Sequence, residues 1–356
     1  MANTAYYSSL KAFHFPDHLQ AVGAGEMPPP VHVRIKPTNR CNQNCWFCAY
    51  RSDNVKLGED MDEADQIPER KMFEIVDDLI AMGVRAVTFS GGGEPLLYKP
   101  LPKVVQRLGA AGVKIGCLTN GTNLKGGMAD ALAAFGCWVR VSINGADDEG
   151  YARARGVKVG DYSRVLANIH AFAERTSTCT LGASLIIGRD NFDRVFDACA
   201  DLKRAGVRHV KLSAAVVGND ISENNAYHVG ILDTVRAEAV RAQGLNDDTF
   251  QVVDHYHLLG DRFEKPYTRC PSLGLLTVIG ADQAIYACQD KAYTEGGRLG
   301  SIKDMSFRDF WFSAQNSEAQ CAIDPSRHCR HHCAGHAKND LLNAYLDIDP
   351  DHAAFV

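Results

Sequence analysis

Long apolar runs are absent from this sequence, since no stretch reaches the length of about 18 residues that a membrane-spanning helix requires. A secretory signal is absent too, because the first residues, MANTAYYSSLKAFHF, lack a basic start followed by an apolar stretch. Basic residues are not in excess, since the chain has 38 Lys and Arg residues and 43 Asp and Glu residues. These absences argue against a membrane span, secretion and a nucleic-acid partner, so we expect a cytoplasmic protein.

Cysteine, by contrast, is plentiful, with 12 residues in a chain of 356. Disulfides are not expected, because a chain without a signal peptide stays in the reducing cytosol. Clustered cysteines in such a chain favour metal binding instead. Two groups stand out: first Cys41, Cys45 and Cys48, then Cys270, Cys288, Cys321, Cys329 and Cys333. We expect the four scattered cysteines to be small buried apolar residues: Cys117, Cys137, Cys179 and Cys199.

Between residues 31 and 215, short apolar segments alternate with segments of helical periodicity. Strict alternation predicts an α/β fold, with a parallel sheet and helices on its outer side. The carboxyl ends of parallel strands share one rim, where the functional groups of such folds gather. The cysteine loop and the stretches SGGGEP, TNG and SING all lie at these ends, so four motifs meet at one rim. The predicted strands are residues 31–38, 85–95, 114–121, 138–145, 181–188 and 209–215.

The chain divides into four expected parts. Residues 1–30 form an N-terminal arm that ends in GEMPPP, a stretch unsuited to helix or central strand. Residues 31–215 form a partial (β/α)6 barrel similar to a TIM barrel, and residues 216–265 form a helical linker that contains a helix over 222–244. Residues 266–356 form a small cysteine-rich domain, which opens with a β-hairpin built from LLTVI, GADQ and AIYAC.

The spacing C-x3-C-x2-C after a first strand, followed by GGEP and SING in order, resembles the radical S-adenosylmethionine superfamily over residues 31–215. The resemblance implies that Cys41, Cys45 and Cys48 hold a 4Fe–4S cluster and leave one iron open, since full ligation takes four thiolates. S-adenosylmethionine then chelates this iron, and an electron from the cluster cleaves it. The product is a 5′-deoxyadenosyl radical that removes a hydrogen atom from the substrate.

The same resemblance implies which residues surround S-adenosylmethionine. Trp46 is expected near the adenine, with packing over the cluster as the alternative, and Asn144 stands where the S-x-D-G pattern of the family has Asp. A plain turn at TNG and a solvated Arg155 also stay open as alternatives. The expected cofactor-binding residues are Trp46, Gly92, Gly93, Glu94, Thr119, Asn120, Ser142, Asn144 and Arg155.

The second cysteine group and the stretch GRLGSIKDMSFRDFW resemble the auxiliary-cluster domains called SPASM and twitch. Five cysteines instead of seven imply the shorter twitch form with one auxiliary 4Fe–4S cluster. Cys321 is expected either to replace Cys329 or to stay free. Structural zinc, with His331, His332 or His336 as a rival ligand, is the alternative. The expected ligands are Cys270, Cys288, Cys329 and Cys333.

Such relatives imply a radical S-adenosylmethionine oxidoreductase that acts on a small polar metabolite, such as a sugar or an aminocyclitol. We expect a dehydrogenation with the auxiliary cluster accepting an electron, or else an epimerisation or dehydration. Few residues precede the first strand, so a peptide-binding domain is not expected, and peptide maturation is the alternative. An iron–sulfur electron carrier is the non-enzymatic alternative. The expected electron donor is a flavodoxin or ferredoxin.

A dehydrogenation also needs a base for the proton that leaves with the electron. Cys117 and Cys179 lie near strand ends and are candidates for a hydrogen-atom donor in an epimerisation, although burial is the favoured interpretation of both. The candidates for the base are Arg155, Asp290, Lys291 and His257.

Overall fold

The structure is a computed structural model that describes residues 4–51, 58–256, 263–349 and 351–355. A ten-stranded sheet organises these residues, in the order β10-β9-β8-β1-β2-β3-β4-β5-β6-β7. The six predicted strands are confirmed and pair in parallel in chain order. They are β1 (His32–Ile35), β2 (Ala86–Phe89), β3 (Lys114–Thr119), β4 (Trp138–Ser142), β5 (Thr180–Ile187) and β6 (His209–Ala214).

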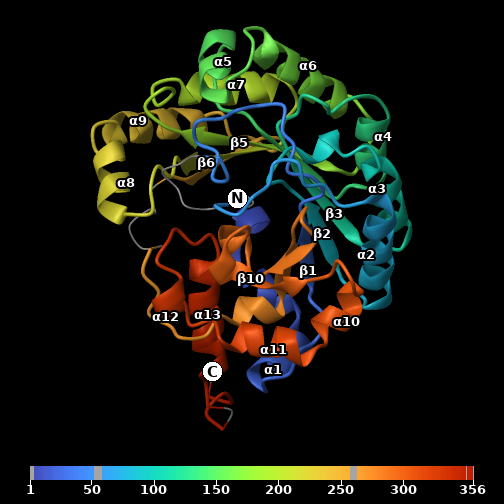
Figure 1. Ribbon diagram of the computed structural model, residues 1–356. Coiled ribbons are helices and arrows are strands. Elements are labelled where there is room, and N and C mark those ends of the chain that lie inside the picture. Colours follow the sequence, from blue (N-terminus) through green and yellow to red (C-terminus); the bar gives the residue numbers. More distant parts are fainter. Residues whose placement is uncertain (1–3, 52–57, 257–262, 350, 356) are drawn as a thin grey trace.

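Helices follow the strands and form an arc on the outer side of the sheet (Figure 1). The predicted α/β fold, a partial barrel with an additional C-terminal part, is thereby confirmed. The helices of the arc are α2 (Glu69–Ala81), α3 (Leu101–Ala110), α4 (Gly126–Phe135), α5 (Asp148–Arg155), α6 (Asp161–Ala173), α7 (Val195–Arg204), α8 (Ile221–His228) and α9 (Leu232–Gln243).

The alternation within each strand decides which side chains enter the barrel. On β1, Val33 and Ile35 are fully buried in the apolar core that the sheet shares with the helices. Successive side chains of a strand point to opposite faces, so Arg34 and Lys36 point to the interior of the barrel. At β1, the side of the sheet that faces the barrel interior is therefore polar, and the side that faces the helices is apolar.

Two features of the linker differ from the sequence-based expectation. A seventh parallel strand, β7 (Gln251–His255), pairs with β6 in a segment whose mixed pattern gave no clear strand signal. The helix predicted over 222–244 is divided into α8 and α9 around Val229–Ile231. Gly230 lies at the division, where glycine weakens a helix because it gains the most backbone entropy on unfolding.

The predicted β-hairpin is present as β8 (Leu276–Ile279) and β9 (Ala284–Tyr286), which pair antiparallel. Strand β8 also pairs in parallel with β1, so the hairpin extends the barrel sheet, and β10 (Arg298–Ser301) adds its outer edge. The C-terminal helices lie at the opening of the arc (Figure 1). They are α10 (Phe307–Trp311), α11 (Ala314–Cys321), α12 (Pro325–His328) and α13 (His336–Leu346).

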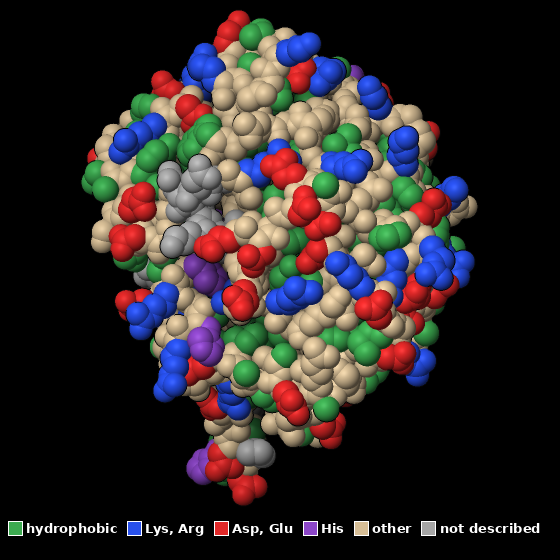
Figure 2. Space-filling model, viewed as in Figure 1, with side chains coloured by type: hydrophobic (Ala, Val, Ile, Leu, Met, Phe, Trp, Pro, Cys, Tyr) green, Lys and Arg blue, Asp and Glu red, His purple; other side chains and the backbone are tan. Residues whose placement is uncertain are grey.

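The N-terminal arm is ordered by packing against the C-terminal helices. It contains the 3-10 helices η1 (Thr4–Tyr7) and η2 (Ser9–His14) and the helix α1 (Pro16–Gly23). Leu19 of α1 and Leu342 of α13 are buried in the same apolar cluster. Acidic and basic side chains are interspersed on the face of the molecule that Figure 2 shows. No helix among the described residues is both long enough and apolar enough to cross a membrane.

Candidate functional site

The first three cysteines lie on the loop that follows β1. This loop is tethered to the end of α5 by two backbone hydrogen bonds. The N–H of Asn44 donates to the carbonyl of Arg155 at 2.9 Å, and the N–H of Trp46 donates to the carbonyl of Ala154 at 3.3 Å. The tether fixes the loop at the rim formed by the carboxyl ends of the strands. Its half-buried thiols are those of Cys41, Cys45 and Cys48.

Two arginines lie close to these thiols. Burial raises the pKa of Cys41 to about 11 and also raises the pKa of Cys48, whereas the positive charge of Arg51 partly opposes both rises. Arg155 places its Nη1 at 3.7 Å from the Sγ of Cys45. Thiolates are the metal-binding form of cysteine, so Arg51 favours the deprotonation of Cys41 and Cys48 that metal binding requires.

Arg155 is the centre of a buried hydrogen-bond network, so the alternative of a solvated Arg155 is wrong. The side chain is only 3% exposed. Its Nη1 donates to Oε1 of Gln43 at 2.9 Å, which reaches the cysteine loop. Its Nη2 donates to Oδ1 of Asn144 at 2.9 Å and to Oγ of Ser142 at 3.0 Å. One guanidinium therefore joins the cysteine loop to the SING motif after β4.

Glu94 joins the ends of β2 and β3. Its Oε1 accepts from Oγ1 of Thr119 at 2.7 Å and from the N–H of Leu96 at 2.9 Å, and its Oε2 accepts from the N–H of Asn120 at 2.7 Å. Burial raises the pKa of Glu94, and these donors oppose the rise because they stabilise the carboxylate. The TNG stretch is thus held by the GGEP stretch. A contact of Glu94 with the methionine ammonium stays a prediction.

The glycines before Glu94 are required by a close backbone approach. A Cβ atom on Gly92 would lie 2.4 Å from Oδ1 of Asn39, and one on Gly93 would lie 2.1 Å from the carbonyl oxygen of Arg40. The glycine run therefore passes directly against the start of the cysteine loop, where a larger residue does not fit.

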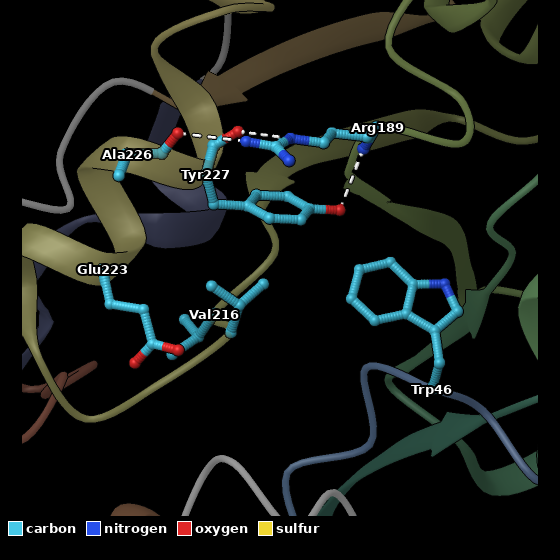
Figure 3. Close-up of a pocket in the computed structure, with 7 residues that line it drawn as sticks. Trp46, Arg189, Val216, Glu223, Ala226 and Tyr227 are labelled. Carbon is cyan, nitrogen blue, oxygen red and sulfur yellow. Dashed lines mark hydrogen bonds between the residues drawn. The ribbon is translucent and has the colours of Figure 1, made fainter.

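A cavity of about 430 Å³ opens beside the cysteine loop, at the ends of β5 and β6 (Figure 3). Trp46 lies on one side of the cavity and is 39% exposed. Its Nε1 donates to Oδ2 of Asp190 at 3.0 Å. Across the cavity, Arg189 lies over the ring of Tyr227 at 4.6 Å, and its Nε donates to the carbonyl of Tyr227 at 2.9 Å. The lining residues are Trp46, Arg189, Val216, Val217, Glu223, Ala226 and Tyr227.

Sequence reasoning named only Trp46 among the residues that line this cavity. Arg189 and Val216 are the second residues after the ends of strands β5 and β6, so their places at the rim were available as a signal. Glu223 and Tyr227 come from α8, and no motif marks them. Their place at the cavity follows from how α8 packs over the strand ends.

Four of the five later cysteines influence one another electrostatically. Burial raises the pKa of Cys270 to about 11 and that of Cys333 to about 12. Repulsion between thiolates adds to this rise, between Cys270 and Cys329 and between Cys288 and Cys333. Cys321 is exposed on α11. Their mutual repulsion indicates that these four thiols lie near one another, and their role as cluster ligands stays a prediction.

Asp290 and Lys291, two of the candidate bases, are engaged in holding the cysteine-bearing tail. Oδ2 of Asp290 accepts from the N–H of Ala334 at 2.8 Å, and Nζ of Lys291 donates to the carbonyl of His328 at 2.9 Å. Both bonds fix the chain around Cys329 and Cys333. The remaining candidate base, His257, lies outside the described residues.

The chemistry of the two cysteine groups can be compared with that of known metal sites. In the described ranges, no three His, Cys, Asp or Glu residues are arranged to hold one metal ion. Both groups consist of thiols, and thiolates are the protein ligands of iron–sulfur clusters as well as of structural zinc. The donor sets therefore fit an iron–sulfur cluster, and zinc remains the alternative.

The histidines of the tail have other partners. Nδ1 of His331 bonds the carbonyl of His332 at 2.9 Å, and Nδ1 of His336 bonds the hydroxyl of Tyr267 at 3.0 Å. Both bonds engage Nδ1 only, and Nε2 of His331 is buried without a hydrogen-bond partner, so His331 remains a rival zinc ligand. Among the scattered cysteines, Cys117 and Cys199 are buried as predicted and Cys179 is half-buried. The prediction for Cys137 is wrong, because this residue is exposed in the turn between α4 and β4.

Residues 35–189 match the family model described as the radical SAM superfamily. A nucleotide dehydratase dependent on S-adenosylmethionine, from Lacinutrix mariniflava, is 32% identical over 37% of this chain and 27% of its own length. A PqqA peptide cyclase of Xanthomonas campestris is 31% identical over 48% of this chain and 43% of its own length. The chain thus spans less than half the length of these two relatives. The PqqA peptide cyclase of Xanthomonas axonopodis is 27% identical over 82% of this chain and 76% of its own length.

Solved structures share the fold at low sequence identity. SuiB of Streptococcus suis, bound to S-adenosylmethionine, has a TM-score of 0.61 at 13% identity, over 87% of this chain and 72% of its own. The enzyme anSMEcpe with bound AdoMet has a TM-score of 0.56 at 17% identity, over 85% of this chain and 89% of its own. These likenesses support the partial barrel with its C-terminal addition.

Proposed function

Residues 35–189 form a radical SAM superfamily domain, and from this premise we propose that the protein is an enzyme that cleaves S-adenosylmethionine to start a radical reaction. The observation that carries the proposal is the convergence at one rim. There the Cys41 loop, the Arg155 network and the cavity beside Trp46 lie at the carboxyl ends of neighbouring strands.

Cys41, Cys45 and Cys48 would hold the 4Fe–4S cluster. With S-adenosylmethionine bound, this cluster would supply the one electron that cleaves the cosubstrate into methionine and the 5′-deoxyadenosyl radical. The chain itself binds and orients the cosubstrate. The cavity beside Trp46 offers an aromatic face to the adenine, and Arg155 holds Ser142 and Asn144 in position for the ribose.

Cys270, Cys288, Cys329 and Cys333 would hold an auxiliary 4Fe–4S cluster. Such a cluster supplies an acceptor for one electron, which suits a net oxidation of the substrate. The support is the mutual repulsion of these four thiols and the exposed position of Cys321 on α11. Lys291 and Asp290 would keep the tail in place, and their role as candidate bases stays a prediction.

A peptide is the substrate class that the relatives favour. The relatives named PqqA peptide cyclase include one that matches 82% of this chain. A small polar metabolite is the second candidate, and the nucleotide dehydratase from Lacinutrix mariniflava favours it. In both cases the substrate must reach the barrel interior next to the Cys41 loop.

The test is anaerobic incubation of the reconstituted protein with dithionite and S-adenosylmethionine. We expect release of 5′-deoxyadenosine by the wild type and loss of this release in Cys45→Ser. Cys137→Ser is the matched control, since Cys137 is exposed and lies outside both cysteine groups. An iron-loaded wild type that releases no 5′-deoxyadenosine refutes the proposal and favours an electron carrier.

A further inference from the structure

Three cationic side chains occupy inward positions on separate strands of the barrel. Arg34 lies on β1, Arg140 on β4 and Lys211 on β6. The residues on both sides of each belong to the apolar core between the sheet and the helices. Because strand side chains alternate, the three cations point into the barrel. The flanking core residues are Val33, Ile35, Val139, Val141, Val210 and Leu212.

Two of the three cations lie over one aromatic ring, and the third is close enough to feel the charge of Arg140. The guanidinium carbon of Arg140 lies 5.6 Å from the ring centre of Tyr7, and Nζ of Lys211 lies 5.3 Å from the same centre. Burial lowers the pKa of Arg34, and the nearby charge of Arg140 lowers it further. Strands β1, β4 and β6 thus bring like charges close together inside the barrel.

The two arginines have neutral partners: Nη1 of Arg34 donates to Oε1 of Gln289 at 3.4 Å, and Nη1 of Arg140 donates to the hydroxyl of Tyr7 at 3.3 Å. Among the described residues, neither arginine forms an ion pair with a carboxylate. The Nε atoms of Arg34 and Arg140 are buried without a hydrogen-bond partner. Asp290 favours the charged form of Arg34, but its Oδ2 already accepts from the N–H of Ala334. Buried donors without a partner are costly, and their survival in a fold calls for an explanation such as a ligand.

The interior also lies next to the proposed reaction site. Lys36 follows Arg34 on the same face of β1, and its Nζ donates to the hydroxyl of Tyr50 at 2.8 Å and to the carbonyl of Gly91 at 3.1 Å. Tyr50 is two residues beyond Cys48, and Gly91 begins the glycine run. A molecule held at Arg34 therefore lies just beneath the cysteine loop.

We propose that Arg34 and Arg140, with Lys211 nearby, bind an anionic group of the substrate, a carboxylate or a phosphate. The inference rests on the proposed function, since it assigns the barrel interior to the substrate. Guanidinium groups suit both anions because their planar N–H donors pair with two oxygens at once. The anion supplies the charge and the acceptors that the buried Nε groups lack.

Two pairs of probes test this inference on the reconstituted full chain by isothermal titration calorimetry. Ribose 5-phosphate is compared with ribose, and a capped hexapeptide with one Glu is compared with its Gln analogue. We expect at least one charged probe to bind about tenfold more tightly than its neutral partner. Preference for the sugar phosphate indicates a phosphorylated metabolite, and preference for the Glu peptide indicates an acidic peptide.

The variants Arg34→Gln and Arg140→Gln, made singly, should each abolish the preference. Arg236→Gln is the control, because Arg236 is exposed and lies 3.8 Å from its ion-pair partner Asp233. Equal binding of both members in each pair by the wild type overturns the inference, and so does a preference that survives both substitutions. Release of 5′-deoxyadenosine by the wild type without substrate tests the proposed function separately, so the two failures are distinguishable.

Discussion

At the scale of single residues, Arg155 connects segments that are far apart in the sequence. We predict that Arg155→Lys lowers the free energy of unfolding by about 2 kcal/mol, because lysine keeps the charge but loses the fork that reaches Gln43 and Asn144 together. The release of 5′-deoxyadenosine should fall at least about tenfold, since the cysteine loop and the SING motif lose their common support. Urea unfolding and product chromatography measure the two effects.

Arg164→Lys is the control for this substitution. Arg164 is about half exposed and pairs with Asp161 on the surface of α6, where an ion pair contributes about 0.5 kcal/mol. If Arg155→Lys behaves like Arg164→Lys in both measurements, the network around Arg155 does not have the role given to it.

His209 provides a second residue-scale prediction. Burial lowers its pKa to about 4, with a smaller effect from the charge of Arg140, so the folded protein keeps His209 neutral. The unfolded chain binds a proton near pH 6.5, so stability is complete above this pH and falls as the pH drops toward 4. The wild type should lose about 2 kcal/mol more than His209→Gln between pH 7 and pH 5.

Urea unfolding at the two pH values measures this difference, and carboxylate titrations common to both proteins cancel. His209 is only 5% exposed, and this burial explains the cost of charging it. Equal losses in the wild type and in His209→Gln would show that the imidazole titrates normally in the folded state.

Which residues meet at the site was only partly predictable from sequence. Arg155, Ser142 and Asn144 follow a recognisable pattern, and the structure brings them together. Arg189 and Tyr227 belong to no pattern, since they meet only because α8 packs over the end of β5. Sequence position shows that a side chain is near the rim, whereas its direction depends on this packing.

At the scale of elements, the contact between the end of α5 and the cysteine loop depends on a glycine. Gly156 has a φ of +60°, and a Cβ atom there would lie 2.8 Å from the carbonyl oxygen of Asn44. We predict that Gly156→Ala costs about 1–2 kcal/mol for the left-handed backbone and more for displacing the loop. Iron content after reconstitution should fall along with stability.

Gly112→Ala is the matched control for this substitution. Gly112 follows α3 with a φ of +81°, and nothing lies within 4 Å of the position of its Cβ atom. The Gly112→Ala variant should therefore lose only the stability that the left-handed backbone costs, and its iron content after reconstitution should not fall. Equal iron content in the two alanine variants would contradict a role of Gly156 in seating the loop.

Elements with a regular hydrophobic pattern were predicted well, whereas those that depend on pairing with distant segments of the chain were not. The strands β1 to β6 alternate regularly with helices, which made them visible in the sequence. Strand β7 was missed because its stretch, QVVDH, lies in a segment that mixes apolar and polar residues without a clear period. The pairing of β8 with β1 is a contact between distant segments, which local sequence does not encode.

At the scale of the whole molecule, the chain would hold two separate metal centres. We predict about eight irons per reconstituted chain and about four in Cys333→Ser, because the auxiliary set then lacks one thiolate. Cys321→Ser should keep the full content, since Cys321 is exposed on α11. Iron and sulfide analysis measures the content of both variants. A loss of iron in Cys321→Ser would show that Cys321 belongs to the ligand set.

The most direct test of the central claim is the electron paramagnetic resonance spectrum of the reduced Cys333→Ser variant with and without S-adenosylmethionine. This variant should keep only the cluster at Cys41, Cys45 and Cys48. The account predicts that S-adenosylmethionine changes the spectrum, because the cosubstrate binds an iron that three thiolates leave open. A cluster spectrum that stays the same at saturating S-adenosylmethionine would contradict it.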